Sequence, residues 1–374
     1  MNYVKLKDVC TINMGQSPSS DSYNENGNGV PFFQGNADFG ERYPVTRKWC
    51  SAPTKMAAPE DILISVRAPI GAMNYAKEEC CIGRGLAALT PNREKVSSDF
   101  IFWLLKGKNE ELNSKGTGST FKAIGRNILE ETLVPDISLE KQIKYSIILE
   151  KTYRVILSRK QQLQKLDDLI KARFVELFGD PISNPKGWKK DKAESHIDLL
   201  SGYPFQSEQY VNDGINICGG LIIMPQKIQW QDCRHWPSVD GYEDYLLAED
   251  DIVMALDRPW ISEGFKIAQV DSTHLPALLI QRTARIRGID VNQQYLFHCF
   301  VNGGFDKHSN VTGSLVPHIS AKDIRSFEIL LPPIKLQKQF AAFVKQVDKS
   351  KVVVQKALDE AQTLFDSLMQ EYFG

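Results

Sequence analysis

The sequence of 374 residues predicts an α+β protein built from two similar halves. Each half would hold one mixed α/β domain followed by one long helix, and the two helices would pair as an antiparallel coiled coil. Three observations give this prediction: an eleven-residue motif occurs twice, other short segments repeat in the same order, and two stretches carry apolar residues at heptad spacing. Such helices would separate the two domains, with a pseudo-two-fold axis relating the halves.

The repeat is clearest in LVPDISLEKQI, which begins at Leu133, and LLPPIKLQKQF, which begins 197 residues later at Leu330. Other pairs keep the same order, with offsets of 190 to 198 residues: DILISVRAP with DIVMALDRP (from Asp61 and Asp251), IGRG with IQRT (from Ile82 and Ile280), GTGST with NVTGS (from Gly116 and Asn310), and the endings FVELFG and LMQEYFG (at Gly179 and Gly374). Loop insertions produce such variation. This alignment matches Arg84 with Arg282.

The first part of each half predicts short strands separated by turns. Apolar runs such as DILISV, DIVMAL and FEILLP alternate with Gly, Asn and Pro turns. Residues 97–114 predict a helix with Ser or Asp as its cap. Pro135 and Pro332 end the last strand of each half, because proline cannot donate to a sheet ladder, and they favour the start of a helix.

The second part of each half predicts a helix with an a/d seam. About 40 helical residues at about 1.5 Å each make a rod of roughly 60 Å. Two separate amphipathic core helices are the alternative. The predicted division is a first domain over 1–135, a central coiled-coil helix over 136–180, a second domain over 181–332 and a C-terminal coiled-coil helix over 333–374. The two seams comprise Tyr145, Leu149, Thr152, Ile156, Arg159, Leu163, Leu166, Ile170, Arg173 and Leu177, and Phe340, Val344, Val347, Lys351, Val354, Leu358, Ala361, Phe365, Leu368 and Tyr372.

The composition is that of a soluble globular protein, with 42% hydrophobic and 24% charged residues. A net charge of −1 excludes a chain that is basic as a whole. The charge is unevenly distributed: residues 138–190 hold twelve Lys or Arg against six Asp or Glu, whereas residues 231–257 hold eight acidic residues against one Arg. No signal-peptide pattern and no membrane-spanning apolar run is present, so we expect a cytoplasmic protein.

Motifs for catalysis are incomplete. DRPW at Asp257 differs from an amino-methyltransferase turn because Arg258 replaces the first proline, and no Gly-rich cofactor loop precedes it. PDISLEKQ has the letters of a nuclease motif, but Glu140 and Lys141 lack the spacer. The phosphate-binding GxxxxGK[ST] pattern is absent, and the six His residues show no metal-binding spacing. We therefore expect no catalytic residues and no metal ligands, with a stand-alone or fused DNA methyltransferase or nuclease as the alternative.

The chain resembles the specificity (S) subunits of type I restriction–modification enzymes. The resemblance rests on the doubled P-[DP]-I-x-L-x-K-Q helix entry, on INMGQSPSSDSYNENGNGVPFFQGNADFG from Ile12, on the Gly-Ser stretches before each helix and on the closing SLMQEYFG. It implies two target-recognition domains, each reading one half of a bipartite DNA target, and helices that set the spacer and bind two methyltransferase (M) subunits. It also implies that S-adenosylmethionine, ATP and Mg are used by those M subunits and by two restriction (R) subunits, and not by this chain. The second half has only a loose counterpart of GQSP, so the two domains are expected to read different sequences.

Polar side chains on the Gly-rich turns are the candidate DNA contacts. Groups at matched positions in both halves are expected to contact phosphate, because small loops admit backbone N–H groups and Arg pairs with phosphate. Groups that differ between the halves are expected to read bases. The first set comprises Arg84, Arg282, Ser119 and Ser314, and the second comprises Gln16, Gln34, Asn36, Arg67, Lys122, Gln206, Arg258, Trp260 and Lys322. For each of them, an ordinary surface or turn residue is the alternative.

Overall fold

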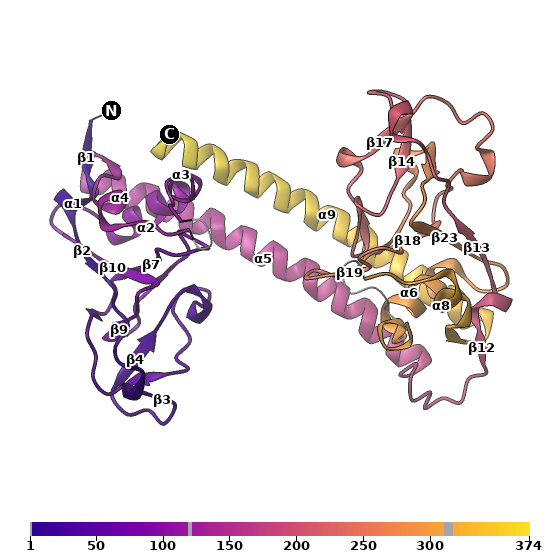
Figure 1. Ribbon diagram of the computed structural model, residues 1–374, viewed down its shortest axis with the longest axis horizontal. Coiled ribbons are helices and arrows are strands. Elements are labelled where there is room, and N and C mark those ends of the chain that lie inside the picture. The colour runs from indigo at the N-terminus through magenta and orange to yellow at the C-terminus, as the bar shows by residue number, and fades with distance from the viewer. Residues whose placement is uncertain (1, 119–121, 310–316) are drawn as a thin grey trace. The chain divides into compact units, whose positions relative to one another are not determined.

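The computed structural model describes residues 2–118, 122–309 and 317–374 (Figure 1). The chain forms two compact units. The first contains Met1–Lys160 and Lys356–Gly374, and the second contains Gln161–Gln355. Each unit therefore holds one mixed domain and part of both long helices.

The domain of the first unit is built on a four-stranded antiparallel sheet of order β2-β10-β7-β8. A mixed sheet of order β3-β5-β4-β9-β6 and the pair β1–β11 accompany it. Its elements are β1 (Tyr3–Lys5), α1 (Leu6–Val9), β2 (Cys10–Met14), β3 (Tyr23–Asn24), β4 (Val30–Phe33), β5 (Trp49–Cys50), β6 (Met56–Ala57), β7 (Ile62–Ser65), β8 (Met73–Tyr75), β9 (Cys80–Ile82), β10 (Leu86–Pro91), α2 (Ser98–Gly107), α3 (Asn109–Ser114), α4 (Arg126–Glu130) and β11 (Leu133–Pro135).

The domain of the second unit repeats this plan. Its four-stranded antiparallel sheet has the order β13-β23-β18-β21, and a three-stranded sheet of order β17-β14-β22 and the pairs β12–β24, β15–β16 and β19–β20 accompany it. Its elements are β12 (Lys190–Lys192), β13 (Ile197–Ser201), β14 (Ile215–Cys218), β15 (Ile223–Met224), β16 (Lys227–Ile228), β17 (Arg234–Trp236), β18 (Ile252–Ala255), β19 (Trp260–Ile261), β20 (Gly264–Phe265), β21 (Ile267–Gln269), β22 (Ala277–Leu279), β23 (Thr283–Gly288), α6 (Gln293–Asn302), α7 (Phe305–His308), α8 (Ala321–Ser326) and β24 (Glu328–Leu330).

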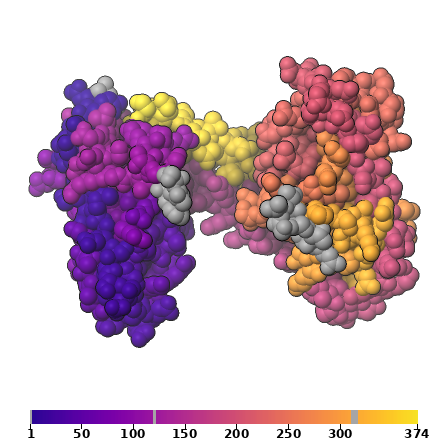
Figure 2. All heavy atoms as spheres, in the orientation of Figure 1, coloured from indigo at the N-terminus to yellow at the C-terminus, as the bar shows by residue number. Residues whose placement is uncertain are grey.

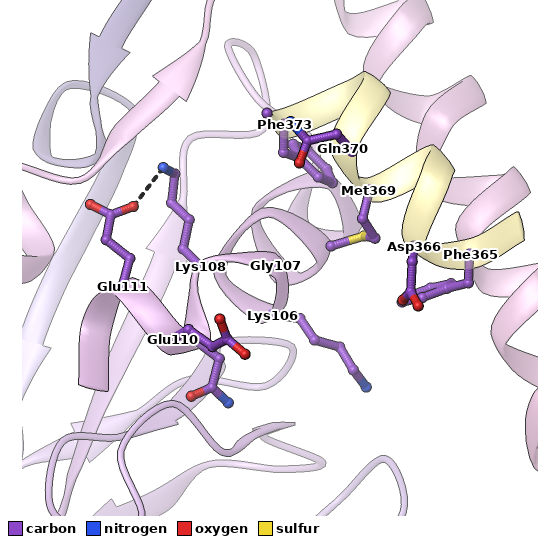
Figure 3. A pocket seen from close by; sticks show the side chains of 12 residues that line it. Lys106, Gly107, Lys108, Glu110, Glu111, Phe365, Asp366, Met369, Gln370 and Phe373 are labelled. Atoms are coloured by element: carbon purple, nitrogen blue, oxygen red, sulfur yellow. Dashed lines mark hydrogen bonds and ion pairs between the residues drawn. The ribbon is translucent and has the colours of Figure 1, made fainter. Parts of the chain in front are cut away.

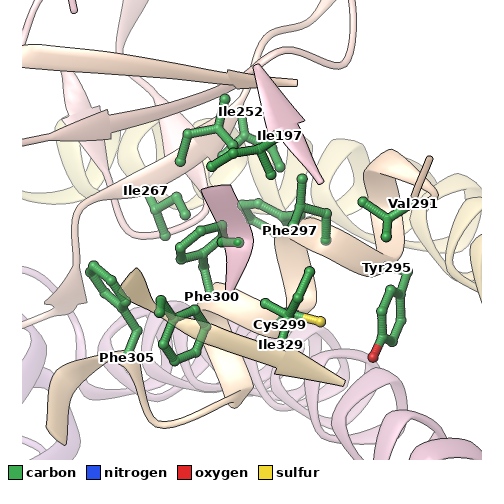
Figure 4. Packing of buried hydrophobic residues seen from close by; sticks show 14 of the residues in the cluster. Ile197, Ile252, Ile267, Val291, Tyr295, Phe297, Cys299, Phe300, Phe305 and Ile329 are labelled. Carbon is green, nitrogen blue, oxygen red and sulfur yellow. The ribbon is translucent and has the colours of Figure 1, made fainter. Parts of the chain in front are cut away.

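The largest buried cluster of the second unit includes side chains of its main sheet and of α6. Ile197, Ile252 and Ile267 come from three strands and lie near Phe297 and Phe300 of α6 (Figure 4). These side chains are buried. Burial of this much apolar surface is the main force that holds a sheet against a helix.

The two long helices are α5 (Leu139–Phe178) and α9 (Ile334–Phe373), each of 40 residues. None of the predicted seam residues is exposed. In the first unit, the start of α5 packs on the end of α9, where the rings of Tyr145 and Tyr372 stack with centroids 3.8 Å apart. In the second unit, the end of α5 packs on the start of α9 through Phe174 and Phe340. The helices are therefore antiparallel, and the predicted fold class is confirmed.

The predicted helix over 97–114 is wrong in one respect, because the structure divides it into α2 and α3. Lys108 lies between them with φ −89° and ψ 11°, outside the helical range.

Backbone pairing shows which residues of the two halves are equivalent. Leu86 pairs with Ser65 and Thr283 with Ala255, so an offset of 197 residues relates β10 to β23. Arg84 is therefore equivalent to Gln281. Arg282 is equivalent to Gly85. The Val66 N–H donates to the Gly85 carbonyl, and the Leu256 N–H donates to the Arg282 carbonyl in the same way. The predicted match of Arg84 with Arg282 is wrong by one residue.

The eleven-letter motif is also out of register. Tyr3 pairs with Pro135 and Lys190 with Leu330, which relates β11 to β24 by 195 residues. α5 and α9 begin and end with the same offset of 195. The sequence alignment that reveals the repeat is thus displaced by two residues from the alignment that the structure gives.

A buried glutamine fixes the entry into each long helix. Gln142 accepts from the Ser97 N–H (2.9 Å) and donates to the Ile137 carbonyl (2.9 Å). Gln337 accepts from the Asn292 N–H (2.8 Å) and donates to the Pro332 carbonyl (2.8 Å). Both residues are 3% exposed. We call this pair of bonds the glutamine clasp. In each half it joins the segment before α2 or α6 to the first turn of α5 or α9.

We predict that Gln337→Ala lowers the free energy of unfolding by about 1–3 kcal/mol, because it leaves the part-buried Asn292 N–H and the buried Pro332 carbonyl without partners. The matched control is Gln339→Ala. The letters align Gln339 with Gln142, but Gln339 is exposed, so its removal should cost less than about 0.5 kcal/mol. Urea unfolding of both variants measures the difference. Equal effects would contradict the clasp.

Candidate DNA interface

Five turns of the first domain converge on one group of loops. We call residues 15–17, 34–36, 66–68, 83–85 and 122–124 the first loop cluster. Main-chain hydrogen bonds join them: Gln16 N–H to Ile82 O (3.1 Å), Gly85 N–H to Gln34 O (3.2 Å), Val66 N–H to Gly85 O (2.9 Å) and Ala68 N–H to Lys122 O (3.0 Å). Segments that are more than a hundred residues apart in the sequence therefore lie in one group of loops.

Glycines allow these turns to approach one another. A Cβ at Gly15 would lie 2.2 Å from the Gly83 carbonyl oxygen, and one at Gly85 would lie 2.5 Å from the Gln34 carbonyl oxygen. Both distances are shorter than any normal contact, so a side chain at either position would push the turns apart. The second domain has the same close approach, where a Cβ at Gly202 would lie 2.0 Å from the Ile280 carbonyl oxygen.

Ser17 connects two of the predicted DNA contacts. The Gln34 side-chain amide donates to the Ser17 hydroxyl oxygen (2.9 Å), and the Arg84 main-chain N–H approaches that oxygen (3.4 Å). Gln34 is exposed although its amide is oriented by this bond. An exposed amide in a fixed orientation is suited to paired hydrogen bonds with a base edge. Sequence reasoning missed Ser17, although it stands in the quoted GQSP stretch.

The first loop cluster gathers most of the predicted residues of its domain. Gln16, Gln34, Arg67, Arg84 and Lys122 are exposed. Asn36 is half-buried in the turn that follows Gln34. Ser119 lies outside the described residues.

The second domain has an equivalent group of loops. We call residues 202–203, 219–220, 256–258, 281–283 and 317–319 the second loop cluster. Its main-chain bonds are Tyr203 N–H to Leu279 O (3.0 Å), Leu256 N–H to Arg282 O (2.9 Å), Arg258 N–H to Pro317 O (2.7 Å) and Ile319 N–H to Leu256 O (2.9 Å). Ser314 lies outside the described residues.

Arg258 and Arg282 are exposed residues of this cluster with left-handed backbone, at φ 45° and φ 67°. This region is unfavourable for an arginine, and such residues concentrate where function constrains a loop. The Arg282 guanidinium lies 3.7 Å from the Asp257 carboxylate. At 71% side-chain exposure, that ion pair contributes little to stability.

The other predicted residues of the second domain are not joined to this cluster by hydrogen bonds among the described residues. The half-buried Trp260 stacks on Phe265 (4.9 Å between centroids) and packs against the core, so the structure gives it a packing role. Among the described residues, Gln206 forms hydrogen bonds within its own turn, to the Pro204 carbonyl (3.2 Å) and from the Gln209 N–H (3.1 Å). Lys322 is exposed on α8.

A separate hollow lies in the first unit, between the junction of α2 and α3 and the end of α9 (Figure 3). Its volume is about 550 Å³, and Met369 and Phe373 line it together with the ion pair of Lys108 and Glu111 (2.9 Å). The end of α9 lies at the surface beside the helices of the first domain (Figure 2). None of the predicted DNA contacts lines this hollow.

Two further features concern metals and membranes. Across residues 2–118, 122–309 and 317–374, no group of three or more His, Cys, Asp or Glu side chains could hold a metal ion. The helices in these ranges are too short or too polar to span a bilayer.

Residues 1–168 and 238–361 match the family described as the type I restriction modification DNA specificity domain. The chain is 43% identical over 165 residues to the putative type I restriction enzyme MjaX specificity subunit of Methanocaldococcus jannaschii, and 30% identical over 232 residues to the type I restriction enzyme EcoAI specificity subunit of Escherichia coli. These alignments cover 44% and 57% of this chain, and 36% and 38% of the relatives. The chain therefore matches less than two thirds of the length of either relative.

A solved structure shares the fold. The S subunit of a type I restriction–modification system from M. genitalium superposes with a TM-score of 0.58 at 13% identity, covering 100% of this chain and 96% of that one. The family match and the two specificity-subunit relatives confirm the resemblance inferred from the sequence. Because the family match takes in most of the chain and both of its halves, the protein belongs to the type I restriction modification DNA specificity domain family.

Proposed function

We propose that this chain is the DNA-reading specificity subunit of a type I restriction–modification system, with each domain reading one half of a bipartite target. The observation that carries the proposal is the pair of loop clusters. Both have the same main-chain framework, with Gly15 and Gly202 at equivalent close approaches. Their side chains at equivalent positions differ, since Gln16, Arg84 and Lys122 stand where the second domain has Tyr203, Gln281 and Pro317.

A shared framework with different side chains suits two readers of different sequences. Base edges in the major groove present distinct patterns of donors and acceptors, so a change of side chain changes the preferred base. Phosphate contacts would position each domain without selecting a sequence.

The long helices would set the spacer between the half-sites and bind two M subunits, with R subunits joining the full enzyme. Leu139, Ile143 and Ile147 support a partner surface, because they lie four residues apart on α5 and are 37%, 46% and 49% exposed. The chemistry would belong to the partners, which would use S-adenosylmethionine, ATP and Mg. The naming of the relatives as specificity subunits supports this division of roles.

We expect Gln34→Ala to relax the preference at a position of the first half-site by about 1–3 kcal/mol, because it removes a bidentate amide. Ser17→Ala should produce a smaller change at the same position, since it frees the amide without removing it. Sequencing of methylated sites from cells that carry each variant measures both effects. Changes in the second half-site instead would contradict the assignment of this domain.

Insertion of four residues in both helices, near Leu163 in α5 and near Val354 in α9, should lengthen the preferred spacer and leave both half-sites unchanged. Four residues add about 6 Å and rotate a helix by about 40° beyond one turn, so the seam is roughly preserved. DNA rises about 3.4 Å per base pair. Mapping of methylated sites should therefore show a spacer nearly two base pairs longer.

The control is an insertion of two residues at the same places, which turns the later seam residues to the wrong face and should destabilise the helix pair. An unchanged spacer in a folded four-residue variant would show that the helices do not set the distance.

A further inference from the structure

Lys266, which directly precedes β21, is a buried cation that contacts the second loop cluster and that no sequence motif indicated. It is 6% exposed, and its ammonium group donates to the carbonyl oxygen of Gly220. Burial lowers the pKa of Lys266, and the nearby positive charge of Arg258 lowers it further. Removing an ammonium from water is costly unless other charges or hydrogen bonds compensate for it.

Compensation by a carboxylate is missing around Lys266. No Asp or Glu of the described residues forms an ion pair with it, and no acidic group raises its pKa. The segment 310–316, which precedes Pro317 in this cluster, contains no Asp or Glu. The carboxylate of Asp257, which belongs to the same cluster, lies 3.7 Å from the Arg282 guanidinium. An ammonium group has three donors, and the residues that the structure describes give a partner to one of them.

The first domain lacks this cation. In the first domain, the Ser65 main-chain N–H donates to the Ala72 carbonyl. In the second domain, the Ala255 N–H donates to the Lys266 carbonyl in the same way, so Ala72 is equivalent to Lys266. In the same way, Ala68 stands where the second domain has Arg258, and Gly85 stands where it has Arg282. Three small residues of the first domain are thus replaced by three cations in the second.

We propose that Lys266 and Arg258 together bind one phosphate of the DNA backbone in the second half-site. This inference rests on the proposed function and adds a residue-level contact to it. A phosphodiester oxygen supplies the missing negative charge and accepts from the ammonium group. Gly219 and Gly220 are half-exposed and have no side chains that would keep a phosphate from the bonded ammonium. Arg258 then positions the DNA and does not read a base.

Binding of the complex with its M subunit to target DNA, measured at several salt concentrations, tests the proposal. Lys266→Gln keeps a neutral donor for Gly220 and removes the charge, so affinity should fall about tenfold or more, by similar factors for all target variants. The slope of log affinity against log salt should decrease by about one. Lys266→Arg should retain most of the affinity and most of the salt slope. The matched control is Lys190→Gln, because exposed Lys190 also donates to a main-chain carbonyl, that of Ile182 (3.2 Å).

A second measurement uses the unaltered protein. Phosphates of the second half-site are replaced one at a time by uncharged methylphosphonates. One replacement should weaken binding to the native protein and to Lys266→Arg, but not to Lys266→Gln. If no position behaves in this way, or if Lys266→Gln changes base preference with an unchanged salt slope, the phosphate contact is wrong. If the native complex does not select a target at all, the proposed function itself fails.

Discussion

The arrangement of each half depends on one buried glutamine side chain. The amide of Gln142 or Gln337 satisfies a main-chain N–H before α2 or α6 and a carbonyl at the entry of α5 or α9. A single side chain thereby fixes where a 40-residue helix starts relative to its domain. An α-helix has a fixed rise and rotation per residue. The position of its first turn therefore sets the direction in which each later seam residue points, so that the seam can face the other long helix.

In both domains, the main chain holds the loop framework together, and the exposed side chains are what differ between them. Glycines at equivalent positions let the turns meet, and main-chain hydrogen bonds hold them in both halves. This leaves the exposed side chains free to differ without loss of the fold. The cations illustrate the difference: the first domain places them at Arg67, Arg84 and Lys122, whereas the second places them one or more residues away in the equivalent framework, at Arg258, Lys266 and Arg282.

The sequence was sufficient to predict the fold class, because heptad seams and ordered repeats are long-range patterns that survive loop insertions. It was not sufficient for register. The letters align Gln142 with Gln339, whereas hydrogen bonds align it with Gln337, because Leu, Pro and Lys recur near any helix start. For the site, polar residues on Gly-rich turns indicated side chains that the first loop cluster brings together, and their contact with DNA stays a prediction. Lys266 gave no signal, since its burial and its lack of a counter-ion exist only in three dimensions.

In the proposed complex, this chain supplies the sequence information and its partners supply the chemistry. Reconstitution on unmethylated genomic DNA with S-adenosylmethionine tests it most directly, with methylated adenines mapped for the M subunit alone, this chain alone, and both together. The prediction is a motif of two half-sites with a fixed gap that appears only when both proteins are present. Methyl transfer by this chain alone, or the same motif from the M subunit alone, would contradict the claim.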